Sequence, residues 1–489
     1  MSWLFTSKPP VVHENYLRTA SPNERRCIAR ESLDFYRALL IGGIYVFGSP
    51  VDTSSIATFI PAVRQCIDRH AHLNITVIEA ETESPSFHFC QRLDLSHHVQ
   101  ILNVDESDVT QEREDQIMER ILPQILDSKW PSGLPPWKVV VIPFSKTRCF
   151  ISFSFSHSLA DGTSGLAFHN TFINALQQQE FGFQNQAKDT VIYTPKKPTL
   201  SPPFDTAQNL PISWSFLLAP LLSTFLPSSL GFRSHIDPIT SKTWTGSPIF
   251  HSPETFKTNV RVLSIDAVAV DRALKACRAN GVKLTGLIHQ FIVAALFKSL
   301  PESENYDNLV AQTAIDIRQL VNTSKQEMGL YVSGEKQVLK APQKTGPVAG
   351  ELWEASKLTT QKLAAAANRR QDHVVGLLRY LNNMHSWMKA KIGERRDSSY
   401  EVSNLLSFRP QPPSSVSGPG CSVVGMVFAQ PADATGAPLS FNIVSVANGP
   451  LVITVTWQAG ALDVEPKISE VEFVGKICED INGSFDNLG

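Results

Sequence analysis

The sequence has no excess of positive charge. Its 44 Lys and Arg residues are matched by 46 Asp and Glu residues, which leaves a formal net charge of -2 at pH 7. Proteins that bind nucleic acid neutralise the phosphate backbone with clustered Lys and Arg side chains. We therefore expect no nucleic-acid partner.

Cysteine is sparse and shows no paired spacing. The seven cysteines are scattered, odd in number and never arranged as C-x-x-C. This pattern is typical of reduced thiols rather than of a disulfide framework or a structural zinc site. The first residues also lack the basic segment and the long apolar segment of a secretion signal. Together these features predict a cytoplasmic protein.

No apolar run is long enough to cross a membrane. The stretch over residues 212–232 is rich in Trp, Phe and Leu, but Pro220 and Pro227 interrupt it, and a spanning helix needs about 20 apolar residues. We expect no transmembrane segment. Two interpretations of this stretch remain: a buried or surface-packed linker, which we favour, and a segment in peripheral contact with a membrane.

The chain does contain enough apolar sequence for more than one core. It has 489 residues, of which 42% are hydrophobic and 18% charged, and chains of this length usually divide into two domains. Residues 196–253 carry many prolines and little periodicity, which predicts a crossover linker. The expected domains are residues 1–195 and residues 254–489.

Helical and strand periodicities occur in both halves, which predicts an α/β fold of the α+β kind with mixed sheets. The expected helices cover residues 56–69, 112–126, 163–177, 266–279, 284–300 and 468–481. The expected strands cover residues 41–47, 137–142, 150–156, 260–265, 311–317, 440–446 and 451–457.

One strand leads into a short polar motif. Over residues 150–156 the sequence alternates, with apolar residues on one face and serines on the other. Strand parity places His157 on the apolar face, where a histidine stays neutral and can accept a proton. A general base that activates a hydroxyl needs this property.

Several simpler interpretations of the motif must be weighed. Ser156 is not expected to be a nucleophile activated by His157, because adjacent strand residues point to opposite faces. Taken alone, His157 would more often be a satisfied core histidine. Asp161 would be a turn residue or a helix N-cap, and Gly162 an ordinary turn glycine.

Other histidines cluster without suggesting a metal site. His70 and His72 form one pair, and His97 and His98 form another. No acidic or thiol side chain stands at ligand spacing from them, so we interpret them as solvated loop histidines and expect no bound metal.

The His-x-x-x-Asp-Gly pattern of His157, Asp161 and Gly162 resembles the signature of the coenzyme A-dependent, chloramphenicol-acetyltransferase-like acyltransferase superfamily. The resemblance is greatest to the fungal alcohol acetyltransferases. Matching segments follow in the expected order at residues 30–36, 134–141, 277–285, 314–318, 328–331, 402–405 and 454–458. The Asp-Phe-Gly-Trp-Gly motif of the plant branch is absent, and Ser156 stands where condensation domains carry the first of two histidines.

The resemblance implies an enzyme, an O-acyltransferase built from two similar domains around a central tunnel. His157 would be the general base at the tunnel midpoint. Acetyl-CoA would be a co-substrate, with no bound cofactor, and the acceptor would be a small-molecule alcohol, which we expect to be a secondary metabolite. Transfer would be direct, without an acyl-enzyme, and the protein would be a monomer.

The resemblance also implies roles for other residues. The motif aspartate, Asp161, would pair with an arginine rather than touch substrate, and the best-matched arginine is Arg318, which could instead be a surface charge at a strand end. Asp316 could support the same arginine. Ser403 and Asn404 are candidates to polarise the thioester oxygen.

Two other functions remain open at this point. The protein could use a carrier-protein thioester as donor or form an amide instead of an ester. It could also be a non-catalytic binding protein that shares the fold.

Overall fold

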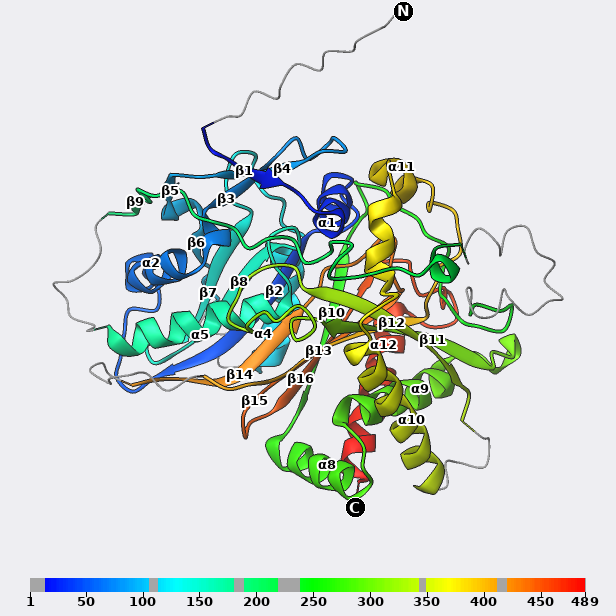
Figure 1. Cartoon of the computed structure of the whole chain (residues 1–489). Coiled ribbons are helices and arrows are strands. Elements are labelled where there is room, and N and C mark those ends of the chain that lie inside the picture. The colour runs from blue at the N-terminus through cyan, green and yellow to red at the C-terminus, as the bar shows by residue number, and fades with distance from the viewer. Residues whose placement is uncertain are drawn as a thin grey trace, which may run out of the picture.

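A computed structural model describes residues 14–104, 113–179, 189–218, 238–342, 349–410 and 420–488 (Figure 1). These residues form a mixed α/β structure with two main sheets, as the periodicities predict. Within the described ranges, no single helix has the length and hydropathy needed to cross a membrane. Part of the apolar stretch at 212–232 lies outside the described residues, and its residues 214–218 form a short helix.

The first sheet, here the N-terminal sheet, has five strands in the order β14-β2-β8-β7-β6. All neighbours are antiparallel except β6 and β7, which are parallel. The strands are β14 (Cys421–Ala429), β2 (Ala38–Phe47), β8 (Arg148–Ser156), β7 (Trp137–Ser145) and β6 (Val99–Ile101). The strand β14 comes from the far end of the chain and pairs with β2, so the C-terminal half contributes to this sheet.

The second sheet, here the C-terminal sheet, has six strands in the order β10-β16-β15-β13-β11-β12. It is mixed, because β13 runs parallel to both β11 and β15. The strands are β10 (Thr258–Ile265), β16 (Leu451–Gln458), β15 (Leu439–Val446), β13 (Tyr400–Phe408), β11 (Asn308–Asp316) and β12 (Val332–Lys340). Two small sheets lie beside the N-terminal sheet, one of β1 (Tyr16–Thr19), β4 (Ser86–Phe89) and β3 (Ile75–Ile78), the other of β5 (Arg92–Asp94) and β9 (Val191–Tyr193).

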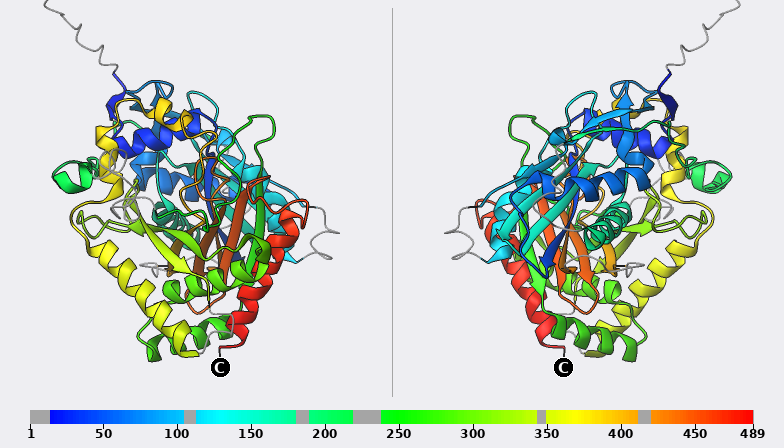
Figure 2. Two further views of the ribbon diagram at one scale, coloured as in Figure 1. Left: turned by 90° about the vertical axis from the view of Figure 1, so that its right-hand side faces the viewer. Right: turned by 90° about the vertical axis from the view of Figure 1, so that its left-hand side faces the viewer.

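Helices cover these sheets. In the C-terminal half, α9 packs against both α10 and α12, and Figure 2 shows α10 and α12 diverging on opposite sides of that half. The helices are α1 (Pro22–Ser32), α2 (Ile60–Arg69), α4 (Glu114–Leu126), α5 (Gly162–Gln178), α8 (Ala267–Ala279), α9 (Leu284–Ser299), α10 (Ala349–Asn368), α11 (Met384–Lys389) and α12 (Glu470–Asp486). Short 3₁₀ helices occur at Ile56–Thr58, Ala71–Asn74, Leu95–His97, Glu302–Glu304 and Val374–Tyr380.

The expected elements match observed ones, with small differences at their ends. The helix predicted over 56–69 is divided into a 3₁₀ turn at Ile56–Thr58 and α2, because Pro61 can only be accommodated in the first turn of a helix. The helix predicted from residue 112 begins at Glu114, and residue 112 lies outside the described residues. Among the longer strands, β12, β13 and β14 were not expected, and the burial of β13 and β14 does not follow a simple alternation.

The alternation in β8 builds the core beneath the motif. Phe153 stacks on Phe168 of α5 with ring centroids 4.0 Å apart, and Ile151 and Phe155 belong to the same buried cluster. The opposite face of the N-terminal sheet packs on α4 in another cluster that includes Val262 and Val452 of the C-terminal sheet. The two halves therefore share an apolar contact, to which β8 contributes Phe150.

Candidate active site

His157 lies in the turn between β8 and α5. Its backbone follows Ser156, the last residue of a strand held between β2 and β7, and α5 begins five residues later at Gly162. The His157 ring lies 5.8 Å from the ring of Tyr36, which belongs to the apolar cluster beneath β8. The rigid strand thus positions the imidazole at the edge of the core.

The hydrogen bond of His157 determines which ring nitrogen can act. The Nδ1 atom lies 2.9 Å from the carbonyl oxygen of Ala160. A carbonyl oxygen only accepts, so Nδ1 carries the proton and Nε2 keeps its lone pair. Burial, assisted by the nearby guanidinium groups of Arg30 and Arg26, lowers the pKa of His157 to about 4. The ring is therefore neutral near pH 7 and can accept a proton at Nε2.

The imidazole lines a large cavity. The cavity has a volume of about 1240 Å³, and its walls come from both halves of the chain. Tyr36 and Leu39 contribute from the N-terminal half, and Ser403, Phe428 and Gln430 from the C-terminal half. Pockets for single small molecules usually measure about 300–1,000 Å³. This cavity has space for two substrates next to His157.

Asp161 forms a buried ion pair with Arg318. The two guanidinium nitrogens donate to the two carboxylate oxygens at 2.8 and 2.9 Å, and both side chains are almost fully buried, at 1% and 4% exposed. The backbone N–H groups of Ser164 and Tyr331 also donate to the carboxylate, each at 2.9 Å. Asp161 is thus both the N-cap of α5 and the centre of a network that joins the two halves.

The structure brings Asp316 and Gly162 to the same region. Asp316 is one-third exposed and accepts from Arg318, at 3.0 Å from its backbone nitrogen and 3.3 Å from its side chain. Gly162, the first residue of α5, packs closely on Leu405. A Cβ atom at Gly162 would lie 2.6 Å from Leu405 Cδ2, so any larger residue there would displace the Leu405 side chain.

Ser403 and Asn404 point in different directions. Ser403 lines the cavity that contains His157. Asn404 is not part of that lining. Its amide donates to Thr285 at 3.0 Å, and its oxygen accepts from the backbone N–H of Leu406 at 2.8 Å. The second bond supports the left-handed backbone of Leu406, at φ 65°, which is costly for a residue with a side chain.

Ser156 is hydrogen-bonded away from the imidazole. Its hydroxyl donates to a carboxylate oxygen of Glu31 and lies 2.6 Å from the Ser158 hydroxyl. Burial raises the pKa of Glu31 to about 7. Among the contacts of the described residues, none joins Ser156 to His157.

One wall of the cavity was missed in the sequence. Arg30 pairs with Asp433 at 2.8 Å, and Tyr36 donates to Gln430 at 2.9 Å. Gln430 in turn donates to Glu401 at 3.2 Å. Arg30 and Tyr36 belong to the family-like segment 30–36, but their partners Asp433 and Gln430 lie about 400 residues away in the chain, so no local pattern indicates these contacts.

The interpretation of three histidines as solvated was wrong. His70, His72 and His98 are buried, with exposures of 3%, 6% and 2%. Desolvation by burial lowers the pKa of each to about 4. His70 bonds Thr171 of α5 at 2.9 Å, and His98 stacks on Trp137 of β7 with ring centroids 4.3 Å apart; local sequence does not reveal these contacts. Within the described ranges, no group of three or more His, Cys, Asp or Glu side chains could hold a metal ion.

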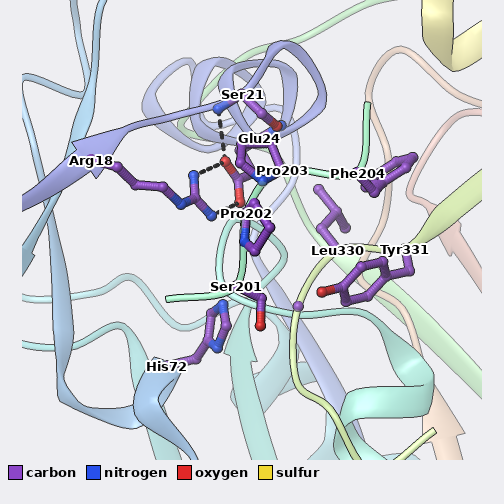
Figure 3. A pocket seen from close by; sticks show the side chains of 11 residues that line it. Arg18, Ser21, Glu24, His72, Ser201, Pro202, Pro203, Phe204, Leu330 and Tyr331 are labelled. Atoms are coloured by element: carbon purple, nitrogen blue, oxygen red, sulfur yellow. Dashed lines mark hydrogen bonds and ion pairs between the residues drawn. The ribbon is translucent and has the colours of Figure 1, made fainter. Parts of the chain in front are cut away.

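A much smaller cavity is lined by Arg18, Glu24, His72 and Tyr331, among other residues (Figure 3). Its volume of about 10 Å³ suits about one water molecule. Arg18 forms a two-pronged ion pair with Glu24 beside it, with both bonds at 2.7 Å, and His72 lines another side. Tyr331, whose backbone bonds Asp161, also lines this cavity.

Comparison with known proteins identifies relatives along nearly the whole chain. The family model described as alcohol acetyltransferase matches residues 28–475. A probable alcohol acetyltransferase of Fusarium pseudograminearum, FCK4, is 24% identical over 93% of both chains. A probable alcohol acetyltransferase of Aspergillus fumigatus, crmB, is 22% identical over 82% of this chain and 86% of the relative.

Solved structures share the fold at low identity. The trichothecene 15-O-acetyltransferase TRI3 of Fusarium sporotrichioides superposes with a TM-score of 0.66 and 12% identity, covering 98% of this chain and 99% of its own. The condensation domain of the Monacolin K polyketide synthase MokA has a TM-score of 0.55 and 13% identity, covering 97% of each chain. The likeness establishes a chloramphenicol-acetyltransferase-like architecture.

Proposed function

The chain belongs to the alcohol acetyltransferase family, and we propose that it transfers an acetyl group from acetyl-CoA to a hydroxyl group, with His157 as general base. One observation carries the proposal. His157, a neutral imidazole with a free lone pair on Nε2, lines a cavity of about 1240 Å³ at the junction of the two halves.

The reaction follows from the protonation state of His157. As the acceptor oxygen attacks the thioester carbonyl carbon, Nε2 removes the hydroxyl proton. The carbon–sulfur bond then breaks, and the imidazolium returns the proton to the departing thiolate, which yields an ester and free coenzyme A. Arg26 and Arg30 disfavour the imidazolium, so the proton is held only briefly. No acyl-enzyme is needed.

The other residues position the base or the substrates. We infer that the Asp161–Arg318 pair, with Asp316, fixes the turn that carries His157, since the pair caps α5 directly after that turn. Gly162 allows α5 to approach Leu405. Ser403 is the candidate to donate to the thioester oxygen, because it shares the cavity with His157.

We infer that the two halves, residues 1–195 and 254–489, act as domains joined by residues 196–253. The volume of the cavity favours a bulky acceptor such as a secondary metabolite. The seven free thiols favour a reducing compartment such as the cytoplasm.

Binding and turnover with acetyl-CoA test the donor. We expect the purified protein to release free coenzyme A from acetyl-CoA when an accepted alcohol is present. A donor concentration about 100 times its Kd should stabilise the folded state by about 2.7 kcal/mol, measured by thermal shift. His157→Ala should keep this stabilisation, because the substitution removes the base and leaves the remaining cavity walls in place.

A carrier-protein donor would give a different result. If acetyl-CoA neither stabilised the protein nor released coenzyme A with any alcohol or amine, the donor assignment would be wrong. Stabilisation by acetyl-CoA without turnover on any acceptor would favour a binding protein.

The transfer rate should be independent of pH between about 8 and about 5.5. The pKa of His157 is lowered to about 4, so its neutral form predominates over this range. A histidine with the ordinary pKa of about 6.5 would lose about tenfold in rate at pH 5.5. The measurement is kcat/KM against pH with an acceptor that does not titrate there.

The control for this profile is the folded fraction, followed by circular dichroism. Buried histidines that stay neutral in the folded state bind protons on unfolding, so stability falls as the pH drops below about 6.5. This applies to His70, His72, His98, His169 and His289, whose pKa values are each lowered to about 4. A tenfold loss of rate in a fully folded protein at pH 5.5 would contradict the assignment.

A further inference from the structure

The wall of the large cavity carries more positive charge than its own ion pairs neutralise. Arg30 pairs with Asp433, Lys336 with Asp397, and Arg369 with Glu335, each at 2.8 Å. The cationic side chains in the lining are Arg26, Arg30, Lys336, Lys362, Arg369 and Lys391. Lys362 is exposed to water. Arg26 and Lys391 are both sheltered in the cavity wall, and neither forms an ion pair with a carboxylate of the described residues.

The contacts of Arg26 leave hydrogen-bond donors unused. Its Nε atom donates to the Asn23 side-chain oxygen at 3.0 Å, and one terminal nitrogen lies 3.6 Å from the Cys27 sulfur, a weak acceptor. Asn23 is fully buried and lines the cavity, yet its Nδ2 atom has no hydrogen-bond partner among the described residues. A buried donor without a partner costs free energy, so an acceptor from a ligand would be stabilising here.

Lys391 supplies a second cation to the same part of the cavity. Its ammonium lies 4.3 Å from the centroid of the Trp387 ring, a contact that does not neutralise the charge. Burial lowers the pKa of Lys391. The charges of Asp397 and Asp433 raise it, and those of Lys336 and Arg26 lower it. Burial also lowers the pKa of Arg26. The two cations therefore lie close enough to repel each other.

The acidic groups nearby act on these two cations only at longer range. Asp433 raises the pKa of both, and Asp397 raises that of Lys391. Asp433 and Asp397 are engaged by Arg30 and Lys336. Glu401 accepts from Gln430, and burial raises its pKa, which favours its neutral form. An anion brought by a ligand could pair directly with Arg26 and Lys391, which no carboxylate of the described residues does.

Arg26 lies near the reacting centre, since its charge helps to lower the pKa of His157, and Lys391 lines the same cavity. On α1, Arg30 follows Arg26 by about one turn and stacks its guanidinium on Tyr36 at 4.1 Å from the ring centroid. The Tyr36 ring is 5.8 Å from the His157 ring. In coenzyme A the whole pantetheine arm separates the thioester from the nearest phosphate. An anion this near to His157 is therefore better supplied by the acceptor than by the donor.

We propose that Asn23, Arg26 and Lys391 bind a carboxylate of the acceptor, which makes the preferred alcohol a hydroxy acid. This inference rests on the proposed acyl transfer and names its substrate class. The carboxylate accepts from the Asn23 amide and from the two cations, while the hydroxyl of the same molecule reaches Nε2 of His157.

Paired acceptors test the proposal. Hydroxybenzoic, hydroxycinnamic and ω-hydroxy fatty acids would each be compared with their methyl esters, with acetyl-CoA as donor. We expect at least one acid to exceed its ester in kcat/KM. Arg26→Gln and Lys391→Gln should each reduce this acid-to-ester ratio about 10- to 100-fold, the usual effect of losing a hydrogen bond to a charged group. Lys389→Gln, with the same charge change on the exposed face of α11, should leave the ratio unchanged.

The other outcomes overturn the proposal in distinguishable ways. If neither Arg26→Gln nor Lys391→Gln changes the acid-to-ester ratio in kcat/KM, the two cations do not bind the carboxylate of the acceptor. An increase in the KM for acetyl-CoA with an unchanged ratio would assign them to the donor phosphates.

If the protein does not catalyse acyl transfer, binding of the acceptor carboxylate by Asn23, Arg26 and Lys391 can still be measured. Calorimetry with the His157→Ala variant should show tighter binding of the acid than of its ester, and Arg26→Gln in that background should remove the difference. Equal binding of acid and ester would overturn the subsite whether or not the enzyme turns over.

Discussion

Replacing His157 with alanine should lower turnover about 10²- to 10⁴-fold while the protein stays folded. The imidazole contributes its Nε2 lone pair to the cavity and makes one hydrogen bond, through Nδ1, to Ala160. Its removal therefore costs little packing but leaves no neutral base next to the acceptor hydroxyl. The measurement is kcat with acetyl-CoA and an accepted alcohol, together with the melting temperature of the variant.

Two variants make the result specific. His157→Gln retains an amide that can hydrogen-bond but cannot take up a proton at neutral pH, so it should be as slow as the alanine variant. His97→Ala, at an exposed position, should keep the full rate. Full activity in purified His157→Ala would show that another group accepts the proton.

The second large effect is expected on stability. Asp161→Asn removes the buried counter-charge of Arg318 and leaves only the one-third exposed Asp316, at 3.3 Å. Breaking a buried pair in this way costs about 3–5 kcal/mol. We expect a lower free energy of unfolding and a lower soluble yield, with the rate falling because the turn carrying His157 loses its support. Arg318→Met should have a similar effect, since it leaves the buried Asp161 carboxylate without a cationic partner.

The pH dependence of this contribution has a definite sign. Arg318, together with the N–H donors of Tyr331 and Ser164, lowers the pKa of Asp161. A carboxyl whose pKa is lower in the folded state stabilises the fold above its ordinary pKa of about 3.9. The contribution is lost as the pH falls through the lowered value. The difference between wild type and Asp161→Asn should therefore be constant across the neutral range.

A surface pair provides the matched control. Asp271 and Lys275 lie 2.7 Å apart on α8, with both side chains more than half exposed, and Asp271→Asn should change stability by no more than about 0.5 kcal/mol. Combining Asp161→Asn with Arg318→Met should recover part of the loss, because no unpaired charge remains. A slower enzyme of unchanged stability would instead give Asp161 a direct role in the chemistry.

Local periodicity predicted the part of the fold that carries the motif. The alternation over residues 150–156 and the helical spacing after residue 162 are each complete within one element, and the structure has β8 and α5 there. The strands β13 and β14 escaped prediction because they pair with strands distant in the chain. The strand β12 pairs with the preceding strand β11, but its sequence is mostly polar. In β13 a register shift near Asn404, with Leu406 in a left-handed conformation, interrupts the alternation.

Site residues that are close together in the chain could be predicted from the sequence, and those far apart could not. His157, Asp161 and Gly162 lie within six positions of each other, so a strand, a turn and a helix N-cap place them with little help from elsewhere. Arg318 and Asp161 are 157 positions apart, and the resemblance to a family, rather than spacing, suggested that they pair. The directions in which the side chains of Ser403 and Asn404 point could not be predicted from the sequence, because they depend on which strands pair with β13.

The sequence by itself determined the elements around the motif and the identity of a histidine able to act as a base, because these depend on the short-range geometry of strands and helices. Only the tertiary structure decided that Asn23, Arg26 and Lys391 line the same cavity as that histidine, and that β14 joins the N-terminal sheet. Such contacts depend on how the apolar faces of helices and sheets pack against each other. The spacing of residues along the chain does not predict the resulting distances.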